Sequence, residues 1–204
     1  GCSDDVLLEN RIIDDVTILE NLDEQYALVH SKTDYIDKNS NIVIKEHSKY
    51  IIPKDDCYFE NLLYFNFISA PGTTLVTSIL KKVGGYDETL LFEDYDMWLR
   101  LSKLNYKFKY NDKINTLYRI HEESMSNSTN YNQLKRMVSE TRKIVMKNIT
   151  EKKHNYLYHD YQIINKHNEL TLLQLFESIY ILINIGRIKL IHFKCFFKTS
   201  LISK

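Results

Sequence analysis

The chain has 204 residues, which is enough for one domain with a hydrophobic core, alone or with an appendage. Its 27 basic and 27 acidic residues give a formal net charge of zero, so no overall positive field indicates a nucleic-acid partner. The hydrophobic share of 44% and the charged share of 26% are those of an ordinary soluble globular protein.

The chain begins with residues 1–5 (GCSDD), without an initiator methionine or a charged-then-apolar leader. We interpret this abrupt start as the middle of a domain, and the chain therefore as a fragment of a longer protein. Apolar residues at helical spacing then predict a helix over residues 7–21: Leu8, Ile12, Val16 and Leu19. Asp4 or Asp5 could cap this helix, which is one interpretation of the acidic pair.

Short strands, turns and helices alternate in the next part of the chain. Residues 26–30 and 42–44 are strand-forming runs on either side of a polar turn, so a hairpin-like pair is predicted. Residues 57–65 and 77–83 predict two short helices. Between them, Pro71 and Gly72 precede a β-branched stretch. Small residues there would let a ligand approach the backbone, and a plain turn before a strand is an equal alternative.

Residues 92–100 (FEDYDMWLR) are the most informative stretch. One face of a predicted helix over residues 93–104 is apolar, through Met97, Leu101 and Leu104. Three carboxylates crowd its start: Glu93, Asp94 and Asp96. They suit the positive end of a helix dipole. The glycine turn in residues 83–88 leads directly into them, however, which favours a second interpretation, that one carboxylate is a positioned functional group.

Residues 106–110 and 114–118 predict two more strands. The polar run 126–130 then separates a mixed part from a wholly helical part, so we predict two domains, residues 1–128 and 129–204. No segment has the ~20 largely uncharged residues of a membrane span. The pattern of residues 188–198 is both apolar and basic, and fits either an interfacial helix on anionic lipid or a helix packed on its own domain.

Four segments occur in a fixed order: residues 3–12, 34–41, 82–101 and 118–126. Together they resemble the acceptor-side half of a family 2 glycosyltransferase, an inverting enzyme with the GT-A fold. The resemblance covers about residues 1–128 and implies an α/β fold, a partial GT-A-like domain followed by an α-helical C-terminal extension. The nucleobase-binding half of that family precedes the Asp-X-Asp motif and is absent from this sequence, and Ser3 stands where many members have another aspartate.

The resemblance also implies roles for individual residues. Asp94 matches the catalytic base, and Glu93 the neighbouring acid that contacts the acceptor. Asp5 matches a ligand of a divalent cation, Mn²⁺ or Mg²⁺, and Asp4 a group that binds the donor ribose or the metal. His121 follows the second strand pair, where a histidine completes the metal site in some relatives.

Two further residues have two interpretations each, and a third has one. Arg119 could bind the donor diphosphate, or pair with Glu122 or Glu123. Trp98 could stack on an acceptor sugar or lie in the core. Asp96 could pair with Arg100 at a spacing of four residues, so we expect it to be structural.

The sequence therefore predicts an enzyme that transfers a sugar from a nucleoside-diphosphate donor to a hydroxyl of a glycan, lipid-linked or protein acceptor, in bacterial surface-polysaccharide or glycan synthesis. The alternative is a truncated, non-catalytic relative that acts as a binding or assembly module. We expect a cytoplasmic location, peripheral to the membrane if the basic-apolar tail binds lipid. The odd set of widely spaced cysteines, which favours no disulfide framework, agrees with a reducing compartment: Cys2, Cys57 and Cys195.

Overall fold

The computed structural model describes residues 4–44, 52–64, 66–121 and 131–149. They belong to one compact unit, Gly1–Thr150, built around a twisted mixed sheet. Its centre is a parallel pair, β2 (Tyr26–Ile36) and β5 (Lys107–Arg119). β1 (Val6–Leu7) is antiparallel to β5, while β3 (Ile42–Ile44) and β4 (Thr73–Leu75) are antiparallel to β2. The mixed α/β fold and the hairpin-like pair β2–β3 agree with the sequence.

The two strands predicted over residues 106–110 and 114–118 are one long strand, β5, which begins at Lys107. Its register against β2 shifts around Lys32, so that Ser31 pairs with Asn111 but Lys32 pairs with Ile114. The polar residues between Asn111 and Ile114 resembled a turn in the sequence. They are accommodated as a bulge, which lets a strand absorb extra residues without ending.

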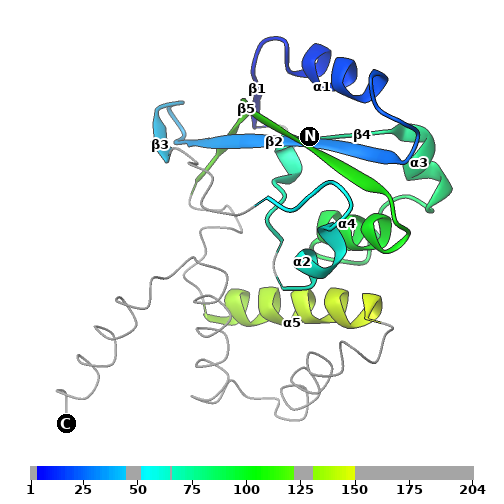
Figure 1. The fold of residues 1–204 in the computed structure, drawn as a ribbon. Coiled ribbons are helices and arrows are strands. Elements are labelled where there is room, and N and C mark those ends of the chain that lie inside the picture. Colours follow the sequence, from blue (N-terminus) through cyan, green and yellow to red (C-terminus); the bar gives the residue numbers. More distant parts are fainter. Residues whose placement is uncertain (1–3, 45–51, 65, 122–130, 150–204) are drawn as a thin grey trace, which may run out of the picture. The chain divides into compact units, whose positions relative to one another are not determined.

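Helices cover both faces of the sheet (Figure 1). α1 (Arg11–Glu20) lies on one face, and α2 (Tyr58–Tyr64) and α4 (Glu93–Lys103) lie on the other. α3 (Thr77–Lys82) follows β4, and α5 (Tyr131–Asn148) packs against α4. Because both faces are covered, five consecutive residues of β2, residues 27–31, are buried, the pattern expected of a central strand.

The helices predicted within the described residues are present, but α1 begins at Arg11 instead of residue 7 and packs on its polar side. Arg11 and Asp15 are buried against the sheet, where Arg11 Nη2 donates to the carbonyl of Thr73 (2.9 Å) and Thr74 Oγ1 donates to Asp15 (2.7 Å). Two residues of the predicted apolar face, Ile12 and Val16, are 52% and 40% exposed. The apolar spacing therefore identified the helix correctly but not the face that contacts the sheet.

Gly72 explains the small residues before β4. It ends the 3₁₀ turn η1 (Ala70–Gly72) and lies directly against β2. A Cβ atom there would stand 2.8 Å from Thr33 Oγ1 and 2.9 Å from the Ser31 carbonyl oxygen, closer than packed atoms allow. The glycine thus lets this turn pack against the strand, and the alternative of backbone left open for a ligand does not hold at this position.

The C-terminal predictions fall largely outside the described residues. The boundary near residue 128 and the helices predicted after residue 150 both do, as does the basic-apolar pattern of residues 188–198. The helix predicted from Tyr131 is α5, in the same compact unit as the sheet. Among the described helices, none combines the length and the apolar character needed to cross a membrane.

Candidate functional site

Several of the residues singled out in the sequence meet where β2 and β5 end. Ile36 pairs with Arg119 at the carboxyl ends of these parallel strands, and β1 brings the start of the chain beside them. The group comprises Asp4, Asp5, Asp37, Arg119 and His121, and we call it the Arg119 cluster. Its five members come from three of the four resembling segments, and Asp5 and Arg119 are 114 residues apart in sequence.

Arg119 holds this cluster together. Its Nε donates to the carbonyl of Asp4 (2.9 Å), and its Nη1 donates to the carbonyl of Asp37 (2.7 Å) and to Ser40 Oγ (3.1 Å). Its backbone N–H donates to Asp5 Oδ1 (3.0 Å). Three separate segments are thus fixed around one guanidinium. The alternative partners Glu122 and Glu123 lie outside the described residues.

Asp37 shapes the loop between β2 and β3, to which Arg119 donates two hydrogen bonds. Its carboxylate accepts the backbone N–H groups of Asn39 (2.8 Å) and Asn41 (2.9 Å), and the Asn41 side-chain amide (3.0 Å). These bonds, the Asn41 side chain foremost, lower the pKa of Asp37 below its ordinary value. The Asp37 carboxylate therefore stabilises the turn between β2 and β3.

Asp4 and Asp5 do not cap the following helix. α1 begins at Arg11, with Asn10 at the capping position, and β1 stands between it and the acidic pair. Asp4 Oδ2 instead lies 3.3 Å from His121 Nε2, and the two side chains are 41% and 39% exposed. Asp5 is half-buried behind them.

The donor atoms of Asp4 and His121 fit a divalent cation that binds only a few protein groups. A carboxylate oxygen beside an imidazole nitrogen suits Mn²⁺ better than Mg²⁺, which prefers oxygen alone. Within the part of the chain that the structure describes, no three metal-ligating side chains gather into one site. Any cation here would therefore complete its shell with water or with a ligand such as a diphosphate.

The acidic start of α4 forms the second part of the candidate site. Glu93 is exposed and Asp94 is half-buried. Burial raises the pKa of Asp94, as does the Glu93 carboxylate, although bonds from the Tyr95 backbone N–H and the Asn66 side chain oppose the shift. A carboxyl whose pKa is raised by desolvation is a better proton acceptor than an exposed one, which suits a general base.

Tyr86 is a neighbour that the sequence did not single out. Its ring is 39% exposed, and its pKa is raised first by burial and then by the carboxylates of Asp94 and Glu93. It follows Gly84 and Gly85, whose positive φ angles of 87° and 72° turn the chain before α4. The GGYD motif contained the signal, because an aromatic residue beside a glycine turn and an acidic pair is suited to contact a sugar.

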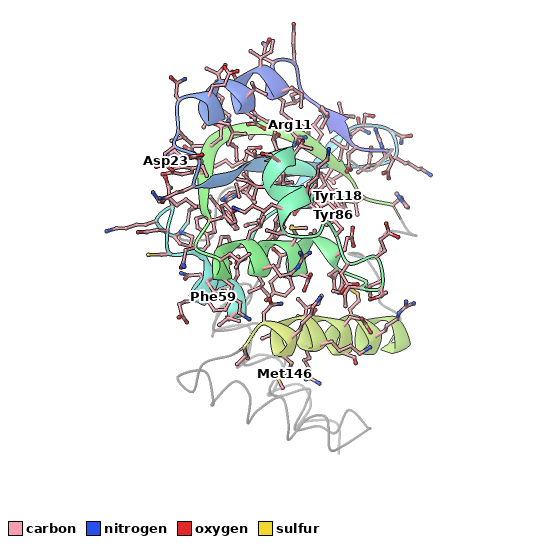
Figure 2. The ribbon with its side chains drawn as sticks, turned by 90° about the vertical axis from the view of Figure 1, so that its right-hand side faces the viewer. Arg11, Asp23, Phe59, Tyr86, Tyr118 and Met146 are labelled. Carbon is pink, nitrogen blue, oxygen red and sulfur yellow. The ribbon has the colours of Figure 1, made fainter. Side chains whose placement is uncertain are left out.

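The start of α4 and the Arg119 cluster face the same end of the sheet. α4 ends at Lys103 and β5 begins at Lys107, so the helix and the strand run in opposite directions. The start of α4 is therefore on the side where β5 ends at Arg119. Figure 2 labels Tyr86, before α4, and Tyr118, beside Arg119, among the side chains of this unit.

Two residues of α4 belong to the core. Trp98 is 1% exposed, so its indole ring presents no face to a sugar, and the core alternative describes it. Asp96 is fully buried and accepts from Arg100 Nε (2.7 Å), which confirms the structural pair expected from the spacing.

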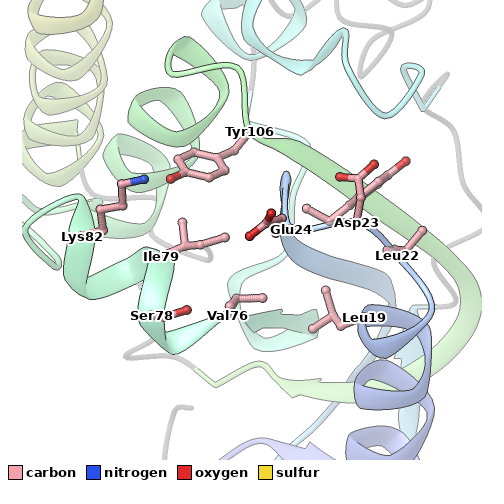
Figure 3. Close-up of a pocket in the computed structure, with 10 residues that line it drawn as sticks. Leu19, Leu22, Asp23, Glu24, Val76, Ser78, Ile79, Lys82 and Tyr106 are labelled. Carbon is pink, nitrogen blue, oxygen red and sulfur yellow. The ribbon is translucent and has the colours of Figure 1, made fainter.

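A separate cavity of about 410 Å³ lies at the opposite end of β2 (Figure 3). Its lining comes from the end of α1, from α3 and from the segments that begin β2 and precede β5, with Leu19, Glu24, Ile79, Lys82 and Tyr106 among its residues. It contains none of the residues predicted to be functional. The candidate site therefore comprises the Arg119 cluster and the start of α4.

Comparisons with known proteins identify the family of the chain. The family model described as glycosyltransferase-like family 2 matches residues 2–172. An uncharacterized glycosyltransferase of Rickettsia typhi is 29% identical over 139 residues, which are 64% of this chain and 41% of that protein. Its counterpart in Rickettsia prowazekii is 30% identical over the same shares. The match thus spans about two fifths of the length of these relatives.

Proposed function

Because the chain belongs to the glycosyltransferase-like family 2, we propose that it forms the acceptor side of an inverting glycosyltransferase that uses a nucleoside-diphosphate sugar. The observation that supports this most is the direction of α4, whose start faces the end of the sheet where β5 ends. A half-buried carboxylate with a raised pKa, Asp94, thus faces the same end as a cluster suited to a phosphate-bound cation.

In the proposed reaction, the acceptor hydroxyl oxygen forms a bond to the anomeric carbon. The bond from that carbon to the diphosphate oxygen breaks on the opposite side, which inverts the configuration. Asp94 receives the hydroxyl proton as the oxygen attacks, and Glu93 and Tyr86 flank the acceptor. The exposed carboxylate of Glu93 would accept hydrogen bonds from sugar hydroxyls, and the Tyr86 ring would pack on a sugar face.

The Arg119 cluster would serve the donor. Asp4 and His121 would bind a divalent cation, which when bound neutralises the charge that develops on the leaving diphosphate, and the Asp5 carboxylate would add its negative charge to the site. Arg119 keeps these residues in place and adds a fixed positive charge next to them. Four bonds already engage its guanidinium and backbone N–H, so its first contribution is to position the loops of the cluster.

We place this activity at the cytoplasmic face of a bacterial membrane, in the synthesis of a surface polysaccharide or another glycan. The bacterial source of both relatives supports the setting. The acceptor would be a glycan, a lipid-linked intermediate or a protein, and the basic-apolar pattern of residues 188–198 would provide peripheral contact with anionic lipid.

The test uses the complete protein with a panel of nucleoside-diphosphate sugars and Mn²⁺, and measures release of nucleoside diphosphate. One donor should be consumed, removal of the cation by chelation should stop its consumption, and NMR of the product should show an inverted anomeric centre. Release that is independent of the cation would contradict the role of the Arg119 cluster. No consumption of any donor in the presence of glycan and lipid-linked acceptors would favour the non-catalytic binding module.

A further inference from the structure

The link between α3 and α4, residues 83–92, leads directly into Glu93 and Asp94. The glycines at its start adopt left-handed backbone conformations that other residues rarely take, so the link leaves α3 in a sharp turn. Its path decides where the first turn of α4, and hence the Asp94 carboxylate, stands. The contacts that hold this link are therefore relevant to the proposed base.

Arg100 of α4 holds the beginning of the link. Its Nη1 donates to the carbonyl of Val83 (2.8 Å) and its Nη2 to the carbonyl of Gly85 (2.7 Å). The same guanidinium donates through Nε to Asp96, two residues after Asp94 (2.7 Å). The Arg100 side chain thus connects the glycine turn to α4 by hydrogen bonds.

Lys147 of α5 holds the middle of the link. Its Nζ lies 2.8 Å from Asp87 Oδ2 in the link and 3.1 Å from Asp96 Oδ1 in α4. Asp87 in turn accepts from Thr89, through the backbone N–H (3.2 Å) and the hydroxyl (2.6 Å). The ammonium group therefore joins a folded turn of the link to the helix that carries Asp94.

The neighbouring residue strengthens this connection. Asn148 Nδ2 lies 3.4 Å from Asp96 Oδ1 and also donates to the carbonyl of Ile144 (2.9 Å), so the end of α5 is fixed at the buried carboxylate. Asp96 is 0% exposed, whereas the Lys147 and Asp87 side chains are 43% and 33% exposed. A bridge with one end at a buried charge holds its geometry better than two exposed charges do.

The charge states support the bridge at neutral pH. Bonds from Lys147 and then from Thr89 lower the pKa of Asp87 to about 2. Burial lowers the pKa of Lys147, but the carboxylates of Asp87 and Asp96 more than offset this and raise it above its ordinary value. Both partners therefore stay charged throughout the physiological range.

We propose that Lys147 is a positioning residue for Asp94, which it serves by tying the link before α4 to Asp96 within α4. The proposal rests on the proposed function, since it concerns the same site. It gives α5 an indirect part in the reaction. General bases act only when held within a few tenths of an ångström of the proton they receive, so a loosened link reduces turnover.

The test compares three variants of the complete enzyme: Lys147→Met, Lys147→Arg and Lys143→Met. Lys143 is the matched control, because it lies one turn earlier on α5 and bonds only to Glu140 of the same helix among the described contacts. We expect Lys147→Met to lower kcat by about 10- to 100-fold with the donor KM within about twofold. Lys147→Arg should restore most of kcat, and Lys143→Met should leave it unchanged.

A second measurement does not depend on activity. Titration of the Asp94 carboxyl by ¹³C NMR should show a pKa above the ordinary value in the wild type. In Lys147→Met this pKa should fall toward the ordinary value as water reaches the loosened turn, and in Lys143→Met it should not move. Equal titration curves and equal kcat values in the two methionine variants would overturn the proposal.

The two measurements also separate this proposal from the proposed function. An Asp94 pKa that moves only in Lys147→Met, in a protein that consumes no donor, would support the positioning and contradict the transferase. Transfer that is lost in Asp94→Asn but unchanged in Lys147→Met would support the transferase and overturn the positioning.

Discussion

Replacing Arg119 by methionine should separate three segments that the guanidinium now joins. The variant loses the bonds to the carbonyls of Asp4 and Asp37 and to Ser40 Oγ, while the methionine keeps most of the apolar stem. The part-buried bond to Asp37 is worth about 1.5 kcal/mol, and each of the two exposed bonds about 0.5 kcal/mol. We therefore expect the free energy of unfolding to fall by about 2.5 kcal/mol.

Urea unfolding followed by circular dichroism measures this loss. Lys113→Met is the matched control on the same strand, since Lys113 Nζ lies 2.8 Å from Asp14 in a pair whose lysine is 63% exposed. That variant should lose less than about 0.5 kcal/mol, as exposed pairs do. Arg119→Lys should fall between the two, because one ammonium cannot reach all three acceptors. Equal losses in Arg119→Met and Lys113→Met would refute the idea that Arg119 organises the cluster.

Three further predictions concern the site and the fold. Asp5→Ala in the complete protein should weaken cation-dependent donor binding, and an unchanged Mn²⁺ titration would remove Asp5 from the cation site. Gly72→Ala should lower the free energy of unfolding by about 1–3 kcal/mol, because the added methyl group would collide with Thr33 and Ser31. An unchanged urea midpoint would contradict this and show that the turn can move away from β2. Burial lowers the pKa of His30 from 6.5 to about 4, so the stability that the neutral imidazole contributes is present above pH 6.5 and lost as the pH falls through 4. The loss amounts to about 3 kcal/mol. His30→Gln should remove that part of the acid sensitivity, whereas an equal dependence of the free energy of unfolding on pH in both proteins would contradict this.

The sequence predicted most of the fold because its patterns are local. Turn residues, strand-forming runs and apolar spacing located β3, β4, the start of β2 and the described helices to within a few residues, but β2 continues to Ile36, beyond its predicted end at residue 30. It could not predict the bulge in β5, because residues 111–113 are polar and only pairing with β2 keeps them in a strand. Nor could it predict that α1 packs through Arg11 and Asp15, since their partners Thr73 and Thr74 lie about 60 residues away.

The candidate site was predicted as a set of residues, but not as an arrangement. The resemblance selected Asp4, Asp5, Arg119 and His121, and the structure brings them together. Spacing along a helix cannot tell which aromatic residue is exposed, so Trp98 was a candidate and Tyr86 was missed. Lys147 had no signal at all, because a lysine on an amphipathic helix is ordinary until its partners are known.

The central claim is that Asp94 accepts the proton of the acceptor hydroxyl, and one comparison tests it most directly. Transfer and donor binding are measured for the complete wild-type protein and for Asp94→Asn, with Glu88→Gln as an exposed carboxylate control from the same link. We predict that Asp94→Asn lowers kcat by about 10²- to 10⁴-fold with donor Kd nearly unchanged, and that Glu88→Gln changes neither. Retained turnover in Asp94→Asn would contradict the claim, and loss of donor binding would assign Asp94 to the donor side instead.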